Sequence, residues 1–517
     1  MLRQVKPQDH KLRDFFLCAF SAILLSLSFS SFNIWIFAWF GFVPLFLALQ
    51  NKSRLQSFLL SFLTGFLFWS CAIYWLIHVT LAGTIILVLY LALYFGLFGI
   101  VINSKVISRK LQVTNLIFIP AVWVVLEYVR GYLFTGFPWA LLAYSQYSNL
   151  PAIQIADITG VWGVSFIVMF VNVGIYEIVS RKLQVTRLPL DFARGRQGHR
   201  VSYILLGMVC LVIFGYGYFK LYLQPSAHDL QPIKISVIQA DIPQELKWDQ
   251  SARSYIFNRY SSLTEECSRD KPDLIVWPEA SNPEIPGEEN LIFRKILNLA
   301  KQVRIPLLIG SVIKEGEDYF NSALLISPSG EIVDRYDKLH LVPFGEYIPL
   351  KDVLPFLQTV VPIGDMRPGK RYALFSHKMI KYSVLICFED VFPELSRRFA
   401  AKGASLLINI TNDAWYKKTS APFQHLAASV FRAVENRVPL ARSANTGISG
   451  FIDATGKIRY FEKDDNKIFV EGYKTGGIFL DPAHQKSIYT EFGDIFVLIC
   501  LIFALIFGVS VTRLRRE

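Results

Sequence analysis

Three side chains that could carry out acyl transfer each stand at or just beyond the end of a strand-like apolar run. Cys387 ends one run, Glu279 ends a second and Lys338 follows a third. A thiolate attacks a carbonyl carbon, a carboxylate in a dry site can act as its base, and an ammonium group stabilises the oxyanion. These three groups suffice without a histidine. His340 and His425 are the alternatives for the base, and the sequence shows no partner for either.

The three groups belong to a part of the chain in which predicted strands alternate with predicted helices. The turn residues of Ser327-Pro-Ser-Gly330 predict a hairpin between 321–327 and 332–336. Alternating elements with hairpins predict a layered α/β sandwich. The sequence has no GxGxxG motif after a strand and no P-loop, so we expect no nucleotide site. The predicted strands are 233–240, 273–277, 306–312, 321–327, 382–387 and 404–411, and the predicted helices are near 250–268, 288–303, 391–402 and 420–437.

The chain as a whole is too apolar for a soluble protein of its length. Of its 517 residues 53% are hydrophobic, and the mean hydropathy is +0.37. Residues 1–224 and 490–511 are hydrophobic with few charges, whereas 225–489 read as an ordinary soluble domain. We expect a transmembrane domain of seven helices in 1–224, a catalytic domain in 225–489, and an eighth transmembrane helix with a basic tail in 490–517.

Eight membrane spans are expected from the uncharged stretches. Two fall within 15–51, two within 55–104, and one each at about 115–133, 160–180, 202–223 and 492–511. Lys and Arg gather in the N-terminal segment, in alternate loops and in the C-terminal tail. This pattern puts both termini in the cytoplasm and the catalytic domain outside, which in a bacterial inner membrane is the periplasm.

The net charge and the spacing of the cysteines do not indicate a nucleic-acid-binding protein or a metal-binding protein. The net charge is +12, but no nucleic-acid motif accompanies it, and loops beside the spans account for much of the excess. The six cysteines include no CxxC pair, so we expect no metal site and no cofactor. The sequence alone is compatible with a disulfide between Cys267 and Cys387 and with two free thiols.

Two further features have alternative interpretations. Glu127 and Arg130 share a helix face in the fifth span, either as an ion pair that locks the bundle or as a contact to a lipid head group or a support for the entrance. The segment 345–375 is rich in Pro and Gly and apolar, which fits a packed loop or a lid. Trp248 is a second candidate lid anchor or a partly buried surface aromatic.

The motifs resemble a known family. Trp277-Pro-Glu279, Tyr336-Asp-Lys338 and Ile386-Cys-Phe-Glu389 are similar to the Glu-Lys-Cys signature of the nitrilase superfamily. The membrane domain together with the stretch Lys338–Pro349 resembles one branch, the apolipoprotein N-acyltransferases. Further similar segments are Gly136–Trp139, Asn409–Trp415 and Arg442–Gly447.

The resemblance implies a two-step reaction. Cys387 takes the sn-1 acyl chain of a phospholipid, typically phosphatidylethanolamine, as a thioester. The acyl group then passes to the α-amine of the diacylglyceryl-cysteine of an apolipoprotein. Glu279 would be the general base and Lys338 would stabilise the oxyanion. The resemblance also implies a nitrilase-like αββα sandwich for the catalytic domain. We expect a monomer in the lipid bilayer, and no nucleic-acid partner because no nucleic-acid motif accompanies the charge.

Supporting residues also follow from the resemblance. Glu346 would orient Lys338 or the amine, unless it is a solvated loop carboxylate. Glu389 would support the nucleophile or form a structural salt bridge, and Phe388 stands where some members have Tyr. The expected supporting or substrate-binding residues are Glu346, Phe388, Glu389, Trp248, Trp415 and Asn412.

Two other functions stay open. The same three groups permit a membrane-anchored amidase or nitrilase that uses water as acceptor. Eight spans also permit a transporter or scaffold with an inert outer domain, although the spans show no ionic chain beyond Glu127 and Arg130.

Overall fold

The protein folds into two compact units, residues 1–224 with 492–517 and residues 225–491. The computed structural model describes residues 7–29, 32–102, 112–185, 196–223, 232–287, 291–343, 345–348, 366–377, 380–480 and 485–513. Most of the predicted lid segment 345–375 lies outside the described residues, so that prediction stays a prediction.

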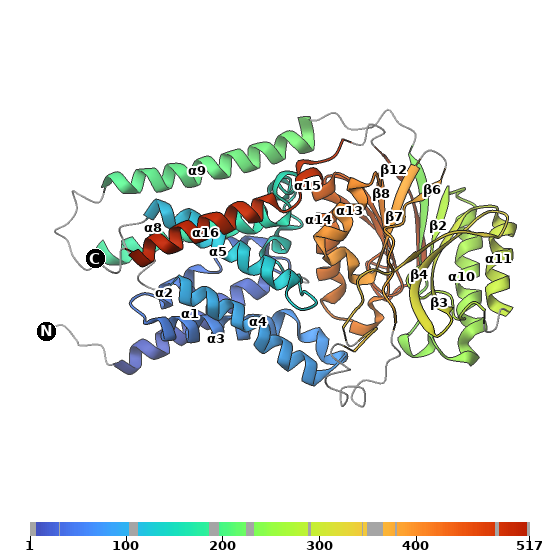
Figure 1. The fold of residues 1–517 in the computed structure, drawn as a ribbon, viewed down its shortest axis with the longest axis horizontal. Helices are drawn as coiled ribbons and strands as arrows, with labels where there is room; N and C mark the ends of the chain where they lie inside the picture. Colours follow the sequence, from blue (N-terminus) through green and yellow to red (C-terminus); the bar gives the residue numbers. More distant parts are fainter. Residues whose placement is uncertain are drawn as a thin grey trace. The chain divides into compact units, whose positions relative to one another are not determined.

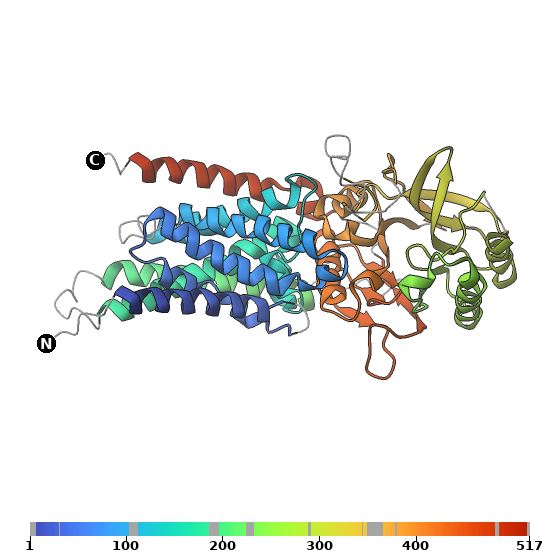
Figure 2. The same cartoon turned by 90° about the horizontal axis from the view of Figure 1, so that it is seen from below.

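The first unit, here called the helical unit, is built of long helices that run alongside one another (Figures 1 and 2). Its packing depends on small residues where helices meet, since a Cβ added at Gly65 would lie 2.6 Å from Phe95 and one at Gly99 2.3 Å from Ser61. The helices are α1 (Pro7–Leu27), α2 (Val43–Ala48), α3 (Arg54–Ala72), α4 (Leu81–Val101), α5 (Gln112–Tyr132), α6 (Leu150–Ile153), α7 (Ala156–Thr159), α8 (Val161–Val185), α9 (Arg196–Tyr218) and α16 (Ile495–Arg513).

Five helical segments of the described residues are long and apolar enough to cross a membrane. They are Arg54–Ala72, Leu81–Val101, Thr114–Tyr132, Val161–Ser180 and Ile204–Leu223. A membrane-type helical unit is therefore supported, whereas eight spans are not confirmed.

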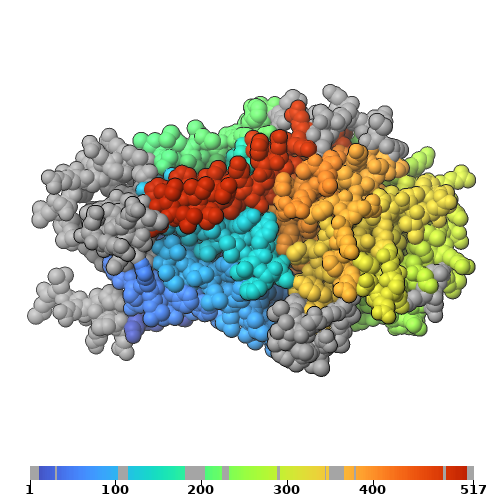
Figure 3. Space-filling view, viewed as in Figure 1, coloured from blue at the N-terminus to red at the C-terminus, as the bar shows by residue number. Residues whose placement is uncertain are grey.

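The remaining three predicted spans differ from the five in identifiable ways. Helix α1 carries Lys11, Arg13 and Asp14 in its first half, and the apolar part of the second predicted span, Trp35–Ala48, is short. The apolar part of α16 is also short, Ile495–Gly508. Helix α16, red in Figure 3, nevertheless exposes Leu498, Ile502 and other apolar side chains on its surface, as a lipid-facing helix does.

The second unit, here called the α/β unit, is the layered α/β sandwich that the sequence predicts. One sheet has the strand order β12-β1-β2-β3-β4-β5 and the other β11-β10-β9-β8-β7-β6. Helices α10 (Arg253–Ser268) and α11 (Leu291–Val303) lie on one side of the sandwich, and α13 (Pro393–Ala401) and α14 (Ala421–Asn436) lie on the other (Figure 1). The Ser443 hydroxyl joins the sheets by donating to the carbonyls of Ile238 and Val276, at 2.8 and 3.1 Å.

The parallel strands determine where chemistry can occur. Strands β1, β2 and β3 are parallel in the first sheet, and β7, β8 and β9 are parallel in the second. The strands are β1 (Ile233–Gln239), β2 (Leu274–Val276), β3 (Leu307–Glu315), β4 (Asp318–Ile326), β5 (Ile332–Asp337), β6 (Phe375–His377), β7 (Ile380–Ile386), β8 (Leu406–Thr411), β9 (Leu440–Ala444), β10 (Gly450–Ile452), β11 (Ile458–Tyr460) and β12 (Gly472–Ile478). Glu279, Lys338 and Cys387 follow the carboxyl ends of β2, β5 and β7.

Candidate active site

Cys387 stands directly after β7 in a left-handed backbone conformation, with φ +55°. A non-glycine residue with this φ is strained by about 1–2 kcal/mol, so its surroundings must hold it. Its carbonyl accepts a hydrogen bond from the Asn409 amide at 2.9 Å and lies 3.3 Å from Nε2 of His425. The 3-10 turn Cys387–Val391 begins there, so the strand end delivers the thiol to a turn whose geometry is fixed.

Glu389 joins the end of β7 to the end of β5. Its buried carboxylate accepts hydrogen bonds from the backbone N–H groups of Ile386 and Leu339, both at 2.7 Å, and of His340 at 3.1 Å. The Tyr336 hydroxyl donates at 2.9 Å. Within the described residues, hydrogen bonds hold Glu389 instead of a salt bridge. Burial raises the pKa of Glu389 to about 7.

Lys338 is only 1% exposed and lies between two carboxylates. Its Nζ is 2.9 Å from Oε2 of Glu346 and 3.6 Å from Oε1 of Glu279. Burial alone lowers the pKa of Lys338, but the carboxylates of Glu346 and Glu279 outweigh it and hold that pKa above its usual value. Lys338 is therefore a fixed cation, and Glu346 is a buried partner of it instead of a solvated loop carboxylate.

Asn321, on β4, was missed by the sequence reasoning. Its amide nitrogen donates to Oε1 of Glu279 at 2.8 Å and to Oε1 of Glu346 at 2.7 Å. Asn321 stands next to another polar residue, Ser322, at the start of the apolar run, so no local pattern marked it. Oε2 of Glu279 has no hydrogen-bond partner in the part of the chain that the structure describes, so this oxygen keeps its capacity to accept a proton.

The Cys387 thiol is 7% exposed. Burial raises its pKa, the Glu279 carboxylate raises it further, and the Lys338 ammonium opposes both. Burial and the Glu279 carboxylate therefore favour the protonated thiol over the thiolate. Cys267 and Cys387 are both free, so the disulfide left open by the sequence is absent.

Neither histidine is placed as a base for the thiol. Both ring nitrogens of His425 lie against carboxylates, Nε2 at 2.7 Å from Asp390 and Nδ1 at 2.9 Å from Asp413. The ring of His340 packs against Phe392, with 3.9 Å between the centroids. The site therefore depends on carboxylate, ammonium and thiol.

The other expected residues lie around this centre at different depths. The ring of Phe388 lies 5.4 Å from Nζ of Lys338. Asn412 is buried and bonds Gln244 at 2.7 Å, so it joins two loops. Trp248 and Trp415 are 51% and 49% exposed.

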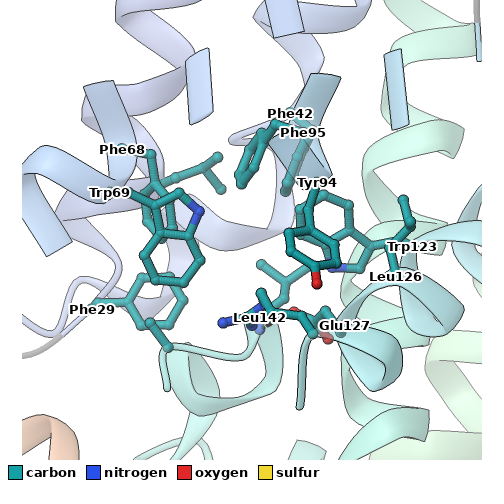
Figure 4. A pocket seen from close by; sticks show the side chains of 13 residues that line it. Phe29, Phe42, Phe68, Trp69, Tyr94, Phe95, Trp123, Leu126, Glu127 and Leu142 are labelled. Atoms are coloured by element: carbon teal, nitrogen blue, oxygen red, sulfur yellow. Dashed lines mark hydrogen bonds between the residues drawn. The ribbon is translucent and has the colours of Figure 1, made fainter. Parts of the chain in front are cut away.

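The helical unit has a pocket of its own (Figure 4). Its volume is about 20 Å³, room for roughly one water molecule. Glu127 accepts from the backbone N–H of Leu142 at 2.7 Å, and Arg130 donates to the carbonyls of Phe137 and Trp139, both at 2.8 Å. No ion pair between Glu127 and Arg130 occurs among the described residues, so these side chains hold the loop after α5 instead.

Comparisons with known proteins agree with both units. The apolipoprotein N-acyltransferase N-terminal domain matches residues 21–174, and the carbon-nitrogen hydrolase family matches residues 234–466. An amidase from Nesterenkonia is 20% identical to this chain, with a TM-score of 0.37, covering 48% of this chain and 90% of the amidase.

Two relatives with higher identity are more informative. The apolipoprotein N-acyltransferase of Geobacter metallireducens is 39% identical over 506 residues, covering 95% of this chain and 93% of the relative. That of Rickettsia prowazekii is 31% identical, covering 74% of each chain. The chain belongs to the apolipoprotein N-acyltransferase family.

Proposed function

We propose that this protein transfers the sn-1 acyl chain of a phospholipid, through a thioester on Cys387, to the N-terminal amine of diacylglyceryl-cysteine in apolipoproteins. The observation that carries the proposal is the buried group of Glu279 and Lys338 beside a thiol at a strained strand end. The names of the relatives supply the acceptor class.

In the first step Glu279 takes the proton of the Cys387 thiol, and Sγ attacks the ester carbonyl. The carbonyl oxygen becomes an oxyanion, which the Lys338 ammonium stabilises. The ester C–O bond then breaks, and the lysophospholipid leaves with the proton from Glu279. The enzyme is left as an acyl thioester.

In the second step the α-amine of the acceptor attacks the thioester. Glu279 takes a proton from the attacking nitrogen, Lys338 again stabilises the oxyanion, and the C–S bond breaks. An amide forms and Cys387 regains its proton from Glu279. Glu346 and Asn321 act through the other two by holding Lys338 and Glu279 in place.

The proposal also covers the acyl donor, the oligomeric state and the membrane topology. Phosphatidylethanolamine is the proposed donor, and the protein acts as a monomer in the bacterial inner membrane. Eight spans, cytoplasmic termini and a periplasmic α/β unit are part of the same proposal, supported by the distribution of Lys and Arg. Removing an acyl chain from the bilayer into water costs roughly 0.8 kcal/mol per methylene, which favours an enzyme that stays in the membrane.

The deciding experiment is mass spectrometry of a lipoprotein N-terminus after depletion of this protein and complementation with variants. Wild-type protein and Cys267→Ala, a matched free buried cysteine of the same unit, should restore the third acyl chain. Cys387→Ala should not. A hydroxylamine-sensitive acyl adduct that persists on Cys387→Ala would reject Cys387 as the nucleophile.

The same experiment addresses a hydrolytic enzyme. Acyl transfer requires that water be kept from the thioester, whereas an amidase admits it. Rapid ammonia release from small amides, with no third acyl chain added, would replace the proposal by the amidase function. Full complementation by Cys387→Ala would instead favour an inert outer domain.

A further inference from the structure

A second buried lysine, Lys247, contacts the segment that carries Glu279. It directly follows the 3-10 turn Gln244–Leu246 and is 4% exposed. Its Nζ donates to the backbone carbonyls of Glu279 at 2.9 Å and Ala280 at 3.2 Å. One ammonium group thus holds two consecutive carbonyls of the turn after β2.

The turn that Lys247 holds is strained. Ala280 has φ +46°, a left-handed conformation that a residue with a Cβ rarely adopts. Consecutive carbonyls point the same way in such a conformation and opposite ways in an extended chain. An ammonium that binds both therefore favours the left-handed form over the extended one.

The opposite side of the turn is fixed by close packing. A Cβ at Gly310 on β3 would lie 2.5 Å from the carbonyl oxygen of Pro278 and 2.7 Å from Cα of Glu279. The carbonyl of Gly310 also accepts from the N–H of Ser281 at 3.0 Å. With β3 on one side and Lys247 on the other, the backbone from which the Glu279 side chain extends is held in place.

Lys247 also brings charge to the site. Burial lowers its pKa to about 8, and the acidic groups of Glu279 and Cys387 oppose that change. At neutral pH it is mainly an ammonium. Glu279 after β2 and Cys387 after β7 are the titratable groups that act on it, and Glu245 and Asp249 beside it in the chain are exposed.

We propose that Lys247 is a positioning residue for Glu279, which fixes the Glu279–Ala280 turn by two hydrogen bonds and places a second positive charge beside the base and the thiol. This inference rests on the proposed function, because Glu279 matters as the base of that reaction.

The test compares Lys247→Met, which removes donors and charge, with Lys247→Gln, which keeps a donor without the charge. Lys295→Met on the exposed face of α11 is the matched control. In single-turnover acylation by a fluorescent phospholipid, Lys247→Met should lower the rate constant about 10- to 100-fold, as small misplacements of catalytic groups do. The donor KM should stay within about twofold, since Lys247 acts through Glu279.

The pH dependence of Cys387 alkylation by iodoacetamide gives a readout that a purely structural role would not change. Loss of the positive charge should move the alkylation curve to higher pH in both Lys247 variants. Lys247→Gln should recover part of the acylation rate through its donor but none of the alkylation shift.

Three results would overturn the inference. They are wild-type acylation by folded Lys247→Met, a loss confined to KM, and an unchanged alkylation curve. If the wild-type protein forms no acyl-enzyme at all, the proposed function fails. The alkylation curves then still decide whether Lys247 acts on the thiol.

Discussion

Two buried charge clusters lie close to Cys387, and they differ in how completely they are paired. In the first, called here the closed cluster, Asp390, Asp413, His425 and Arg442 bond one another. All four carboxylate oxygens of its two aspartates have a partner. In the second, the open cluster of Glu279, Lys338 and Glu346, one oxygen of Glu279 has none among the described residues.

The difference in pairing suggests different roles for the two clusters, one in stabilising the fold and one in the proposed reaction. A completely paired cluster cannot take up a proton or a substrate without breaking an internal bond, so it serves as framework. An incompletely paired carboxylate beside a cation and a thiol keeps a lone pair for a reaction. Distance from Cys387 alone would not distinguish the two clusters. His425 of the closed cluster also lies near Cys387, with its Nε2 3.3 Å from the Cys387 carbonyl.

The largest expected effect comes from breaking the closed cluster. Arg442→Met leaves two buried aspartates with less compensating charge, which should cost about 3–5 kcal/mol of unfolding free energy. Thermal unfolding in detergent measures it, with exposed Arg294→Met as control. Acylation per folded molecule should fall far less than in the Lys338 variant described next, and an equal fall would remove the distinction between the clusters.

Breaking the open cluster should lower the acylation rate strongly and the stability of the fold only slightly. Lys338→Met removes the cation that we propose stabilises the oxyanion, so the single-turnover acylation rate should fall about 100- to 1000-fold. Exposed Lys301→Met is the control. The unfolding temperature should change less than in Arg442→Met. Near-normal acylation by a folded Lys338→Met protein would contradict the assigned role.

A smaller effect is expected at Asn321. Asn321→Ala removes the amide that joins Glu279 to Glu346, and a hydrogen bond to a charged group is worth about 1.5–3 kcal/mol. Acylation should fall by a factor on the order of 10–100, the same energy expressed as a rate. Asn321→Asp should be worse, since it adds a third carboxylate. If Asn321→Asp were the more active of the two, the bridging role would be wrong.

The smallest effect concerns pH. Burial and Arg442 lower the pKa of His425, but Asp390 and Asp413 outweigh them and raise it. A raised folded-state pKa adds stability that is complete below the unfolded pKa of about 6.5 and is lost as pH rises through the folded value. The stability difference between wild type and His425→Gln should therefore shrink with rising pH. A difference that grew would reverse the assignment.

The positions of Glu279, Lys338 and Cys387, the residues proposed to react, could be predicted from the sequence because each follows an apolar strand, a local pattern. Glu346 and Glu389 came only with the family resemblance, since nothing local shows that a carboxylate will be buried. Asn321 and Lys247 were missed because their partners come from other strands and loops.

The secondary-structure elements also differ in whether the local sequence or the tertiary context determines them. The buried stretches of β7 and β8, 382–386 and 406–411, are mainly apolar and were predicted. Strand β12 pairs with β1 although Gly472–Ile478 contains three glycines, and only tertiary pairing makes it a strand. Eight spans were expected from uncharged length, but charges in α1 and the shortness of Trp35–Ala48 leave five segments that qualify.

The carboxylate of Glu389 has a consequence for evolution and engineering. This carboxylate accepts hydrogen bonds from the backbone N–H groups of Leu339 and Ile386, so it ties the residue after Lys338 to the residue before Cys387. We therefore expect engineered changes of donor or acceptor to be tolerated better at exposed aromatic side chains, such as Trp248 and Trp415, than at Lys338 or Cys387.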